Sequence, residues 1–264
     1  MSREQSLNKT IAQIWEDKYV VPLYQRNFSW TEEQIGQLLQ DLYDNAPKLQ
    51  DDQCGNYYLG SLVVLERKDG TWEVIDGQQR LTCLHFICKY LNILKKPCLI
   101  YDSRPEVESF FADLFVKSWN DFIHEYNKID NSKISRLKDA LRIVENFKIR
   151  TGKGDENITL KEMTPDQRNL LAEYISSKVI LVRIPLPQDT DVASYFEIMN
   201  NRGEQLQSHE IVKAMLMQGL NDRDRNIFAT IWDGCSQMNQ PIQQTLSYYR
   251  AMGLFGNNFD SLDF

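Results

Sequence analysis

The stretch that decides the fold is Val74-Ile75-Asp76-Gly77-Gln78-Gln79-Arg80-Leu81-Thr82. A β-prone run from Trp72 to Ile75 stops at the Asp-Gly pair, and apolar residues recur at helical spacing from Leu81 onward. The stretch therefore predicts a strand, a tight turn and a helix, with Asp76 as the N-cap residue of that helix.

The polar residues at this junction suit an anion. The first N–H groups of a helix have no intrahelical partner and favour negative charge, and a guanidinium such as that of Arg80 can bind a phosphate through two parallel hydrogen bonds. A positive charge opposes the dipole at a helix N-terminus, so Arg80 needs another reason to be there. Residues 77–80 therefore predict a phosphate-binding turn. The alternative is a capped turn whose polar groups serve only the fold.

Three segments together resemble one protein family. Residues 74–82 resemble the Asp-Gly-Gln-Gln-Arg motif of the GmrSD-type restriction endonuclease N-terminal domain, which is related to the ParB and sulfiredoxin nucleotide-binding fold. Residues 21–30 resemble its early Pro-x-Tyr-Gln-Arg-x-Phe/Tyr-x-Trp motif. Residues 196–206, with Ser208 and Lys213, resemble its late motif. The three occur in the family's order and bracket most of the chain.

The resemblance implies a sensor domain of a modification-dependent DNA restriction system, an anti-phage defence. It implies that this domain binds a nucleoside triphosphate (GTP, ATP or CTP) and hydrolyses it with Mg²⁺. The expected catalytic residues are Asp76, Gln78, Gln79 and Arg80. The expected nucleotide-binding residues are Gln25, Arg26, Gly77, Gln78, Gln79, Arg80, Thr82, Asn200, Arg202 and Lys213.

Each of these residues also has a plainer interpretation. Arg26 could pair with a surface acid, and Asn200 and Arg202 could cap and bridge two helices. Lys213 could be a surface lysine whose stem lies on apolar neighbours. We interpret Trp30 as a packing residue ahead of the helix that Thr31 caps.

The composition limits the classes of partner. The net charge is −7 over 264 residues, which argues against a broad basic DNA-binding face. Residues 133–153 nevertheless contain seven Lys or Arg and two acids. The candidate DNA-binding residues are Tyr24, Arg136, Lys138 and Arg142. The plainer interpretation of that run, which we favour, is the solvated face of an amphipathic helix.

Several other kinds of site are not supported. The five Cys are scattered, which fits a reducing cytoplasm, and no stretch approaches the roughly 20 apolar residues of a membrane span. Cys83 and His85 would lie on nearly opposite sides of a helix, so no metal site is expected with Cys88. The sequence has no Walker A motif, and three scattered His do not make a nuclease centre.

The predicted fold is α+β, a ParB-like small mixed sheet with flanking helices and a large helical insertion. Strands are expected near residues 20, 60, 73, 99 and 181, and a first helix over 6–16. Residues 1–104 plus 178–220 would form the core, and 105–177 the insertion. Helices are expected over about 190–200 and 208–219. Residues 221–264 would begin as a helix and lead toward a nuclease domain outside this chain.

Two other functions stay open at this point. The domain could sense DNA or a nucleotide without catalysis, which the shortage of obvious catalytic bases favours. It could also nick DNA directly, which the resemblance to ParB-like nucleases would imply, although no carboxylate cluster supports this. The expected partners are a nucleoside triphosphate, DNA (modified or not) and a nuclease domain, with no membrane; a homodimer stays open.

Overall fold

The computed structural model describes residues 7–47, 55–129, 131–152, 156–192, 195, 212–213, 215–217, 220 and 222–235. The chain divides into two compact units, Met1–Val192 and Ala193–Phe264. Among the described residues, no helix combines the length and the apolar character that crossing a bilayer requires.

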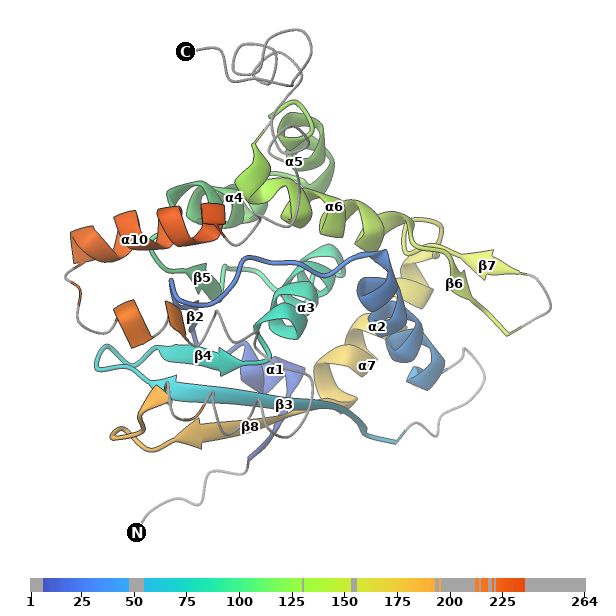
Figure 1. The fold of residues 1–264 in the computed structure, drawn as a ribbon. Helices are drawn as coiled ribbons and strands as arrows, with labels where there is room; N and C mark the ends of the chain where they lie inside the picture. The colour runs from blue at the N-terminus through green and yellow to red at the C-terminus, as the bar shows by residue number, and fades with distance from the viewer. Residues whose placement is uncertain are drawn as a thin grey trace, which may run out of the picture. The chain divides into compact units, whose positions relative to one another are not determined.

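The first unit is built on a six-stranded mixed sheet with the order β1-β8-β3-β4-β2-β5 (Figure 1). The strands are β1 (Asn8–Thr10), β2 (Tyr19–Val21), β3 (Tyr57–Glu66), β4 (Trp72–Asp76), β5 (Leu99–Tyr101) and β8 (Val179–Leu186). β4, β2 and β5 run parallel to one another, and β3 runs antiparallel to β4. β8 pairs parallel with β3 and antiparallel with β1. The predicted mixed α/β class is confirmed.

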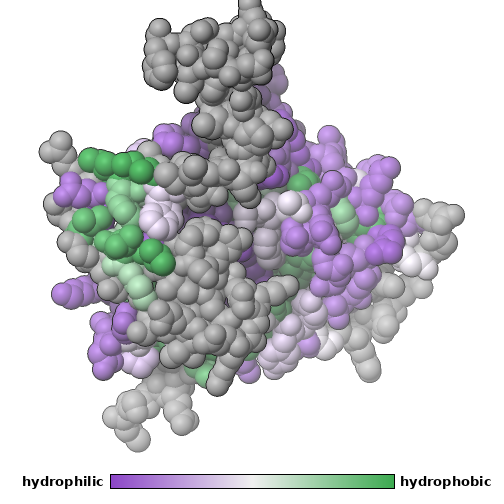
Figure 2. Space-filling view, in the orientation of Figure 1, coloured by the Kyte–Doolittle hydropathy of each residue, from purple (hydrophilic) through white to green (hydrophobic). Residues whose placement is uncertain are grey.

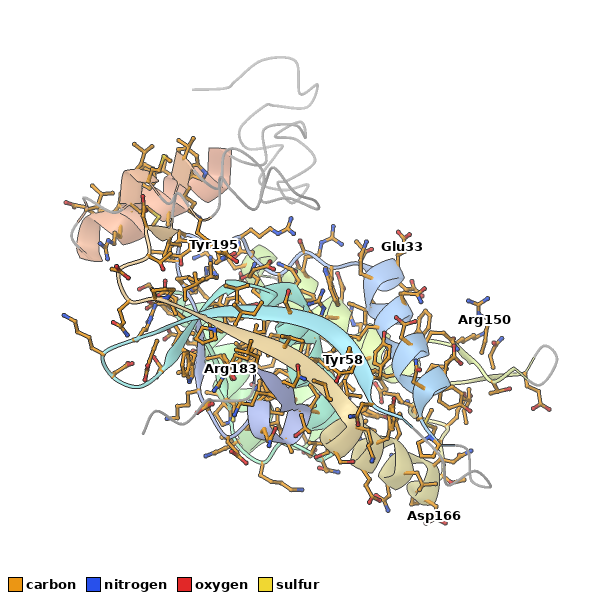
Figure 3. The ribbon with its side chains drawn as sticks, turned by 90° about the horizontal axis from the view of Figure 1, so that it is seen from below. Glu33, Tyr58, Arg150, Asp166, Arg183 and Tyr195 are labelled. Atoms are coloured by element: carbon orange, nitrogen blue, oxygen red, sulfur yellow. The ribbon has the colours of Figure 1, made fainter. Side chains whose placement is uncertain are left out.

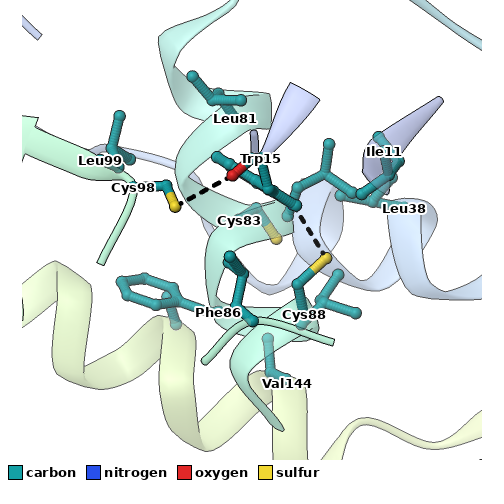
Figure 4. Packing of buried hydrophobic residues seen from close by; sticks show 14 of the residues in the cluster. Ile11, Trp15, Leu38, Leu81, Cys83, Phe86, Cys88, Cys98, Leu99 and Val144 are labelled. Atoms are coloured by element: carbon teal, nitrogen blue, oxygen red, sulfur yellow. Dashed lines mark hydrogen bonds between the residues drawn. The ribbon is translucent and has the colours of Figure 1, made fainter. Parts of the chain in front are cut away.

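Seven helices are described in the first unit. They are α1 (Ile11–Ile14), α2 (Glu32–Asn45), α3 (Gln78–Tyr90), α4 (Pro105–Val116), α5 (Trp119–Tyr126), α6 (Ser132–Asn146) and α7 (Pro165–Lys178). α6 packs against α2, α3 and α4. α3 is buried along most of its length, as expected of a helix that is apolar on every side (Figure 4).

Local sequence signals set several of these boundaries. Thr31 begins α2 in a capping box with Gln34, whose Oε1 accepts from the Thr31 N–H at 2.9 Å. Thr164 caps α7 in the same way, with Pro165 at the first helical position. The turn over residues 68–70 joins β3 to β4 as an antiparallel hairpin.

The structure confirms that the strand near 181 returns the chain to the N-terminal sheet, because β8 pairs with β3. In the second unit, α10 (Asp222–Cys235) confirms the helix expected after residue 221. The helices expected over 190–200 and 208–219 lie largely outside the described residues. The unit boundary falls after Val192, and the assignment of 178–220 to the core stays a prediction.

Three local predictions were wrong. The helix over 6–16 is only four residues long, because residues 8–10 form β1 and pair with the open edge of β8. The N-cap of α3 is Gly77 rather than Asp76, because Asp76 is still paired with Val63 in the β3–β4 ladder. The segment 105–177 is not helical throughout, since β6 (Ile149–Arg150) and β7 (Asn157–Ile158) form a small hairpin.

Candidate nucleotide site

The predicted site residues of the first unit gather at one edge of the sheet. β2, β4 and β5 are parallel neighbours, so their carboxyl ends meet at the same edge. The loop over 22–30 follows β2, the Gly77 turn follows β4, and Arg104 follows β5. In open α/β sheets this edge is where ligands bind.

Three glutamine side chains fasten the 22–30 loop to the turn. Gln25 Nε2 donates to the Ile75 carbonyl at 2.7 Å, and Gln78 Nε2 donates to the Arg26 carbonyl at 2.9 Å. Gln79 Nε2 donates to the Asn27 carbonyl at 3.1 Å, and its Oε1 accepts from the Ser29 N–H at 2.8 Å. All three side chains are buried. Their amides therefore hold the loop rather than lie open to a ligand.

The same loop is also held from its other side. The Tyr24 hydroxyl donates to Glu73 Oε1 at 2.7 Å, and burial, together with that carboxylate, raises the pKa of Tyr24 well above its ordinary value. Arg104 Nη2 donates to the carbonyls of Leu23 and Gln25. Tyr24, a candidate for DNA binding, thus contributes to the loop's anchorage, while the Arg26 side chain is exposed.

Arg80 lies against Gly60, in the irregular part of β3. Its Nη1 donates to the Ser61 carbonyl at 3.0 Å, and a Cβ on Gly60 would lie 3.0 Å from Nη1. Gly60 has a φ of 124°, where the strand pairing with β8 is also irregular. The described residues give Arg80 no carboxylate within ion-pair distance, so the salt bridge to Asp41 that could compete with a ligand is not formed. The guanidinium is therefore held in place without an ion pair to any described carboxylate.

A pocket of about 380 Å³ opens beside this guanidinium. Its walls come from α2, β3, α3 and Trp30, which precedes α2. The lining residues are Trp30, Glu33, Gln34, Gln37, Leu38, Asp41, Tyr57, Leu59 and Arg80. The size lies within the range of small-molecule sites. Glu33 stands at the exposed start of α2 (Figure 3).

Electrostatic coupling links the groups across this pocket. The Tyr57 hydroxyl donates to Asp41 Oδ2 at 3.2 Å. Burial and the Asp41 carboxylate raise the pKa of Tyr57, whereas Arg80 lowers it. Arg80 is therefore close enough to Tyr57 to act on its charge.

Other predicted residues have different surroundings. Asp76 is exposed at the end of β4. Thr82 is buried one turn into α3, and its hydroxyl contacts the Gln78 carbonyl at 2.8 Å and the Tyr101 hydroxyl at 2.7 Å. Asn200 and Arg202 lie outside the described residues. Lys213 belongs to the second unit, where its side chain is buried.

The basic run on α6 is partly used inside the first unit. Lys138 Nζ donates to the Ile129 carbonyl at 2.5 Å, and Arg142 Nη2 donates to Asn127 Oδ1 at 2.7 Å. Both contacts fasten the connection between α5 and α6. Arg136 is exposed.

Cys83 and Cys88 lie in the core of the first unit (Figure 4), and His85 is buried as well. Trp15 Nε1 donates to Cys88 Sγ at 3.4 Å, and burial lowers the pKa of His85 to about 3. Within the described ranges, no three His, Cys, Asp or Glu side chains are grouped to hold a metal ion.

Sequence reasoning missed Trp30, Tyr57 and Arg104 as residues of this edge, and it considered Asp41 only as an ion-pair partner of Arg80. Trp30 was interpreted as a packing residue only, but it also lines the pocket. Arg104 comes three residues after the end of β5, the strand that was expected near residue 99. That position could have marked it as a candidate site residue. Asp41 and Tyr57 carry no motif, and only the fold brings them to Arg80.

Comparison with known proteins identifies a family. The family model described as "GmrSD restriction endonuclease, N-terminal domain" matches residues 6–217. A search of curated proteins finds no match. The matched range contains the 22–30 loop, the Gly77 turn and the wall of the pocket. The chain therefore belongs to the family of GmrSD restriction endonuclease N-terminal domains.

Proposed function

We propose that this domain binds a nucleoside triphosphate at the carboxyl edge of the sheet and hydrolyses it, as the sensor of a DNA restriction system. Arg80 contacts the phosphates, and the exposed Arg26 reaches them from the facing loop. Mg²⁺ would accompany the phosphates as their counter-ion, and the exposed carboxylate of Asp76 would hold a water bound to that ion. DNA and a nuclease are the partners that the family name supports.

The observation that carries this proposal is the Arg80 guanidinium, which forms no ion pair with a described residue and lines a pocket. A half-buried guanidinium without a carboxylate partner costs free energy unless something else compensates it. Arg80 donates one hydrogen bond to the Ser61 carbonyl, and its guanidinium has further N–H donors. The same side chain lines the pocket. An anionic ligand in that pocket supplies the missing partner.

The Arg80→Ala variant tests the phosphate contact. We expect the variant to lose about 1.5–3 kcal/mol of triphosphate affinity, the scale of a hydrogen bond to a charged group. Its melting temperature should change little, because the lost Ser61 contact is one partly exposed bond. Calorimetric titration with each triphosphate and Mg²⁺ gives the affinities.

Arg136→Ala is the matched control, because it removes an exposed arginine of α6 instead. It should bind like the wild type. A lower melting temperature for Arg80→Ala with unchanged triphosphate affinity would make Arg80 a structural residue and overturn the proposal.

Binding without turnover is the second candidate function. Gln79 engages both the nitrogen and the oxygen of its amide with the loop, so it is not poised to orient an attacking water. Release of inorganic phosphate from each triphosphate, measured on the purified protein with Mg²⁺, separates the two. Turnover that Arg80→Ala abolishes supports hydrolysis; tight binding with no phosphate released supports a sensor without catalysis.

A further inference from the structure

The pocket beside Arg80 contains one carboxylate that is held in a fixed position. Asp41 Oδ1 accepts from Gln37 Nε2 at 2.7 Å, and Oδ2 accepts from the Tyr57 hydroxyl at 3.2 Å. Asp41 is half-buried, and the described ion pairs do not include it. A carboxylate offers about four lone-pair positions, so both oxygens keep one for a ligand.

The other walls suit a flat aromatic group. Trp30 and Tyr57 supply aromatic surface, and Leu38 and Leu59 supply apolar surface. Stacking on aromatic side chains binds any base, because every base has a π-face. These walls therefore provide affinity, and the choice between bases falls to the polar groups.

We propose that this pocket selects a guanine base, with Asp41 as the residue that reads it. The proposal rests on the nucleotide-binding function above. A carboxylate only accepts hydrogen bonds. Guanine presents two adjacent donors, N1–H and the 2-amino group, which match the two oxygens of Asp41. Adenine and cytosine each place a ring-nitrogen acceptor beside their amino group, and uracil has a single donor between two carbonyls.

Mismatched bases are rejected for a physical reason. An acceptor placed against the fixed carboxylate repels it, and the lone pairs of Asp41 then lose water without gaining a partner. Sites built to hydrogen-bond a substrate group discriminate strongly against analogues that lack it. Glu33 lines the same pocket but is exposed at the start of α2, so it lacks the fixed position of Asp41.

The wild-type protein provides the first test. Titration with GTP, ATP, CTP, UTP and inosine triphosphate, each with Mg²⁺, should give GTP at least about tenfold tighter binding than the others. Inosine triphosphate differs from GTP only by the missing 2-amino group, so its weaker binding isolates one of the two contacts. Equal binding of all five would overturn the base assignment and leave the phosphate site standing. Binding of none would overturn the proposed function itself.

Asp41→Asn provides the second test. An Asn amide can donate to the 2-carbonyl of xanthine while it accepts from N1–H. The variant should lose about tenfold or more in GTP affinity and gain affinity for xanthosine triphosphate. Glu33→Gln makes the same change of charge in the same pocket and should keep the wild-type ranking. An Asp41→Asn variant that loses affinity for every triphosphate alike, with no gain for xanthosine triphosphate, would make Asp41 a structural residue.

Discussion

Arg80 is placed by a glycine that belongs to another strand. A side chain on Gly60 would press against the guanidinium, which lies over the irregular part of β3. The backbone of Ser61 then fixes one end of that guanidinium by a hydrogen bond. The position of the charge therefore depends on the irregular part of β3 at Gly60 as well as on the helix that carries Arg80.

Gly77 is required by both conformation and space. Its φ is 92°, and a Cβ there would lie 3.1 Å from the Ser61 carbonyl oxygen and 3.2 Å from Leu62 Cδ1. Gly77→Ala should therefore lower the free energy of unfolding by about 2 kcal/mol or more, because a positive φ is strained for alanine and the added methyl group is crowded. Urea denaturation measures the loss.

Gly70→Ala is the control for the strain alone. Gly70 also has a positive φ, 80°, but an added Cβ would meet nothing within 4 Å. It should cost about 1 kcal/mol, and the difference between the two variants gives the cost of crowding. Equal losses in both would show that the contact with Ser61 and Leu62 relaxes freely.

At the scale of elements, the 22–30 loop owes its conformation to side chains of its neighbours. Gln79→Ala removes a donor and an acceptor, and should lower the free energy of unfolding by about 1–3 kcal/mol. Hydrogen exchange should also speed up at Ser29, whose N–H loses its partner. Gln188→Ala, which removes one exposed bond to the Glu66 carbonyl, should cost far less. Unchanged exchange at Ser29 would contradict this role of Gln79.

The basic face of α6 should act as structure rather than as a DNA contact. Lys138→Ala and Arg142→Ala should each lower stability by about 0.5–1 kcal/mol, because both side chains tie α6 to the α5 connection. Arg136→Ala should be neutral. Figure 2 shows hydrophilic side chains over the side that carries α2, and apolar side chains over α10 of the second unit.

Binding measurements decide this question for α6. The variant that combines Arg136→Ala, Lys138→Ala and Arg142→Ala should keep the DNA affinity of the wild type and the salt dependence of that affinity. A uniform loss of affinity across sequences, with a flatter salt dependence, would instead assign the three residues to phosphate contacts.

At the scale of the whole first unit, the core surrounds the imidazole of His85. His85 lies among the rings of Trp15, Phe111 and Phe115, and its Nε2 accepts from the Cys98 N–H at 3.4 Å. Burial lowers the pKa of His85 from 6.5 to about 3. The unfolded chain therefore binds a proton first as the pH falls. The stability from neutral His85 is complete above about pH 6.5 and is lost progressively below it.

The His85→Leu variant tests this pH dependence. Between pH 7 and pH 5 the wild type should lose about 2 kcal/mol more stability than the variant, from 1.36 kcal/mol per pKa unit. Urea denaturation across this pH range measures the difference. His124→Leu, at an exposed position on α5, should keep the wild-type slope. Parallel slopes for wild type and His85→Leu would show that His85 is not the group that titrates.

Local patterns determined much of the fold. The capping boxes at Thr31 and Thr164, the turn over 68–70 and the apolar runs near 60, 73, 99 and 181 all predict elements that the structure contains. These signals are short-range, because they depend on backbone hydrogen bonds and side-chain periodicity within a few residues. The sequence also carried the family motifs and the position of Arg80 in the first turn of α3.

Only the tertiary structure decided what those motif residues do. β1 became a strand because β8 had an open edge, which no local signal over residues 8–10 reveals. Gln78 and Gln79 donate hydrogen bonds from their side-chain amides to a loop about 50 residues away in sequence. Asp41 and Tyr57 meet beside Arg80 because α2 and β3 pack there. Long-range packing and hydrogen bonding set these partners, and the residues that make them are not neighbours in the sequence.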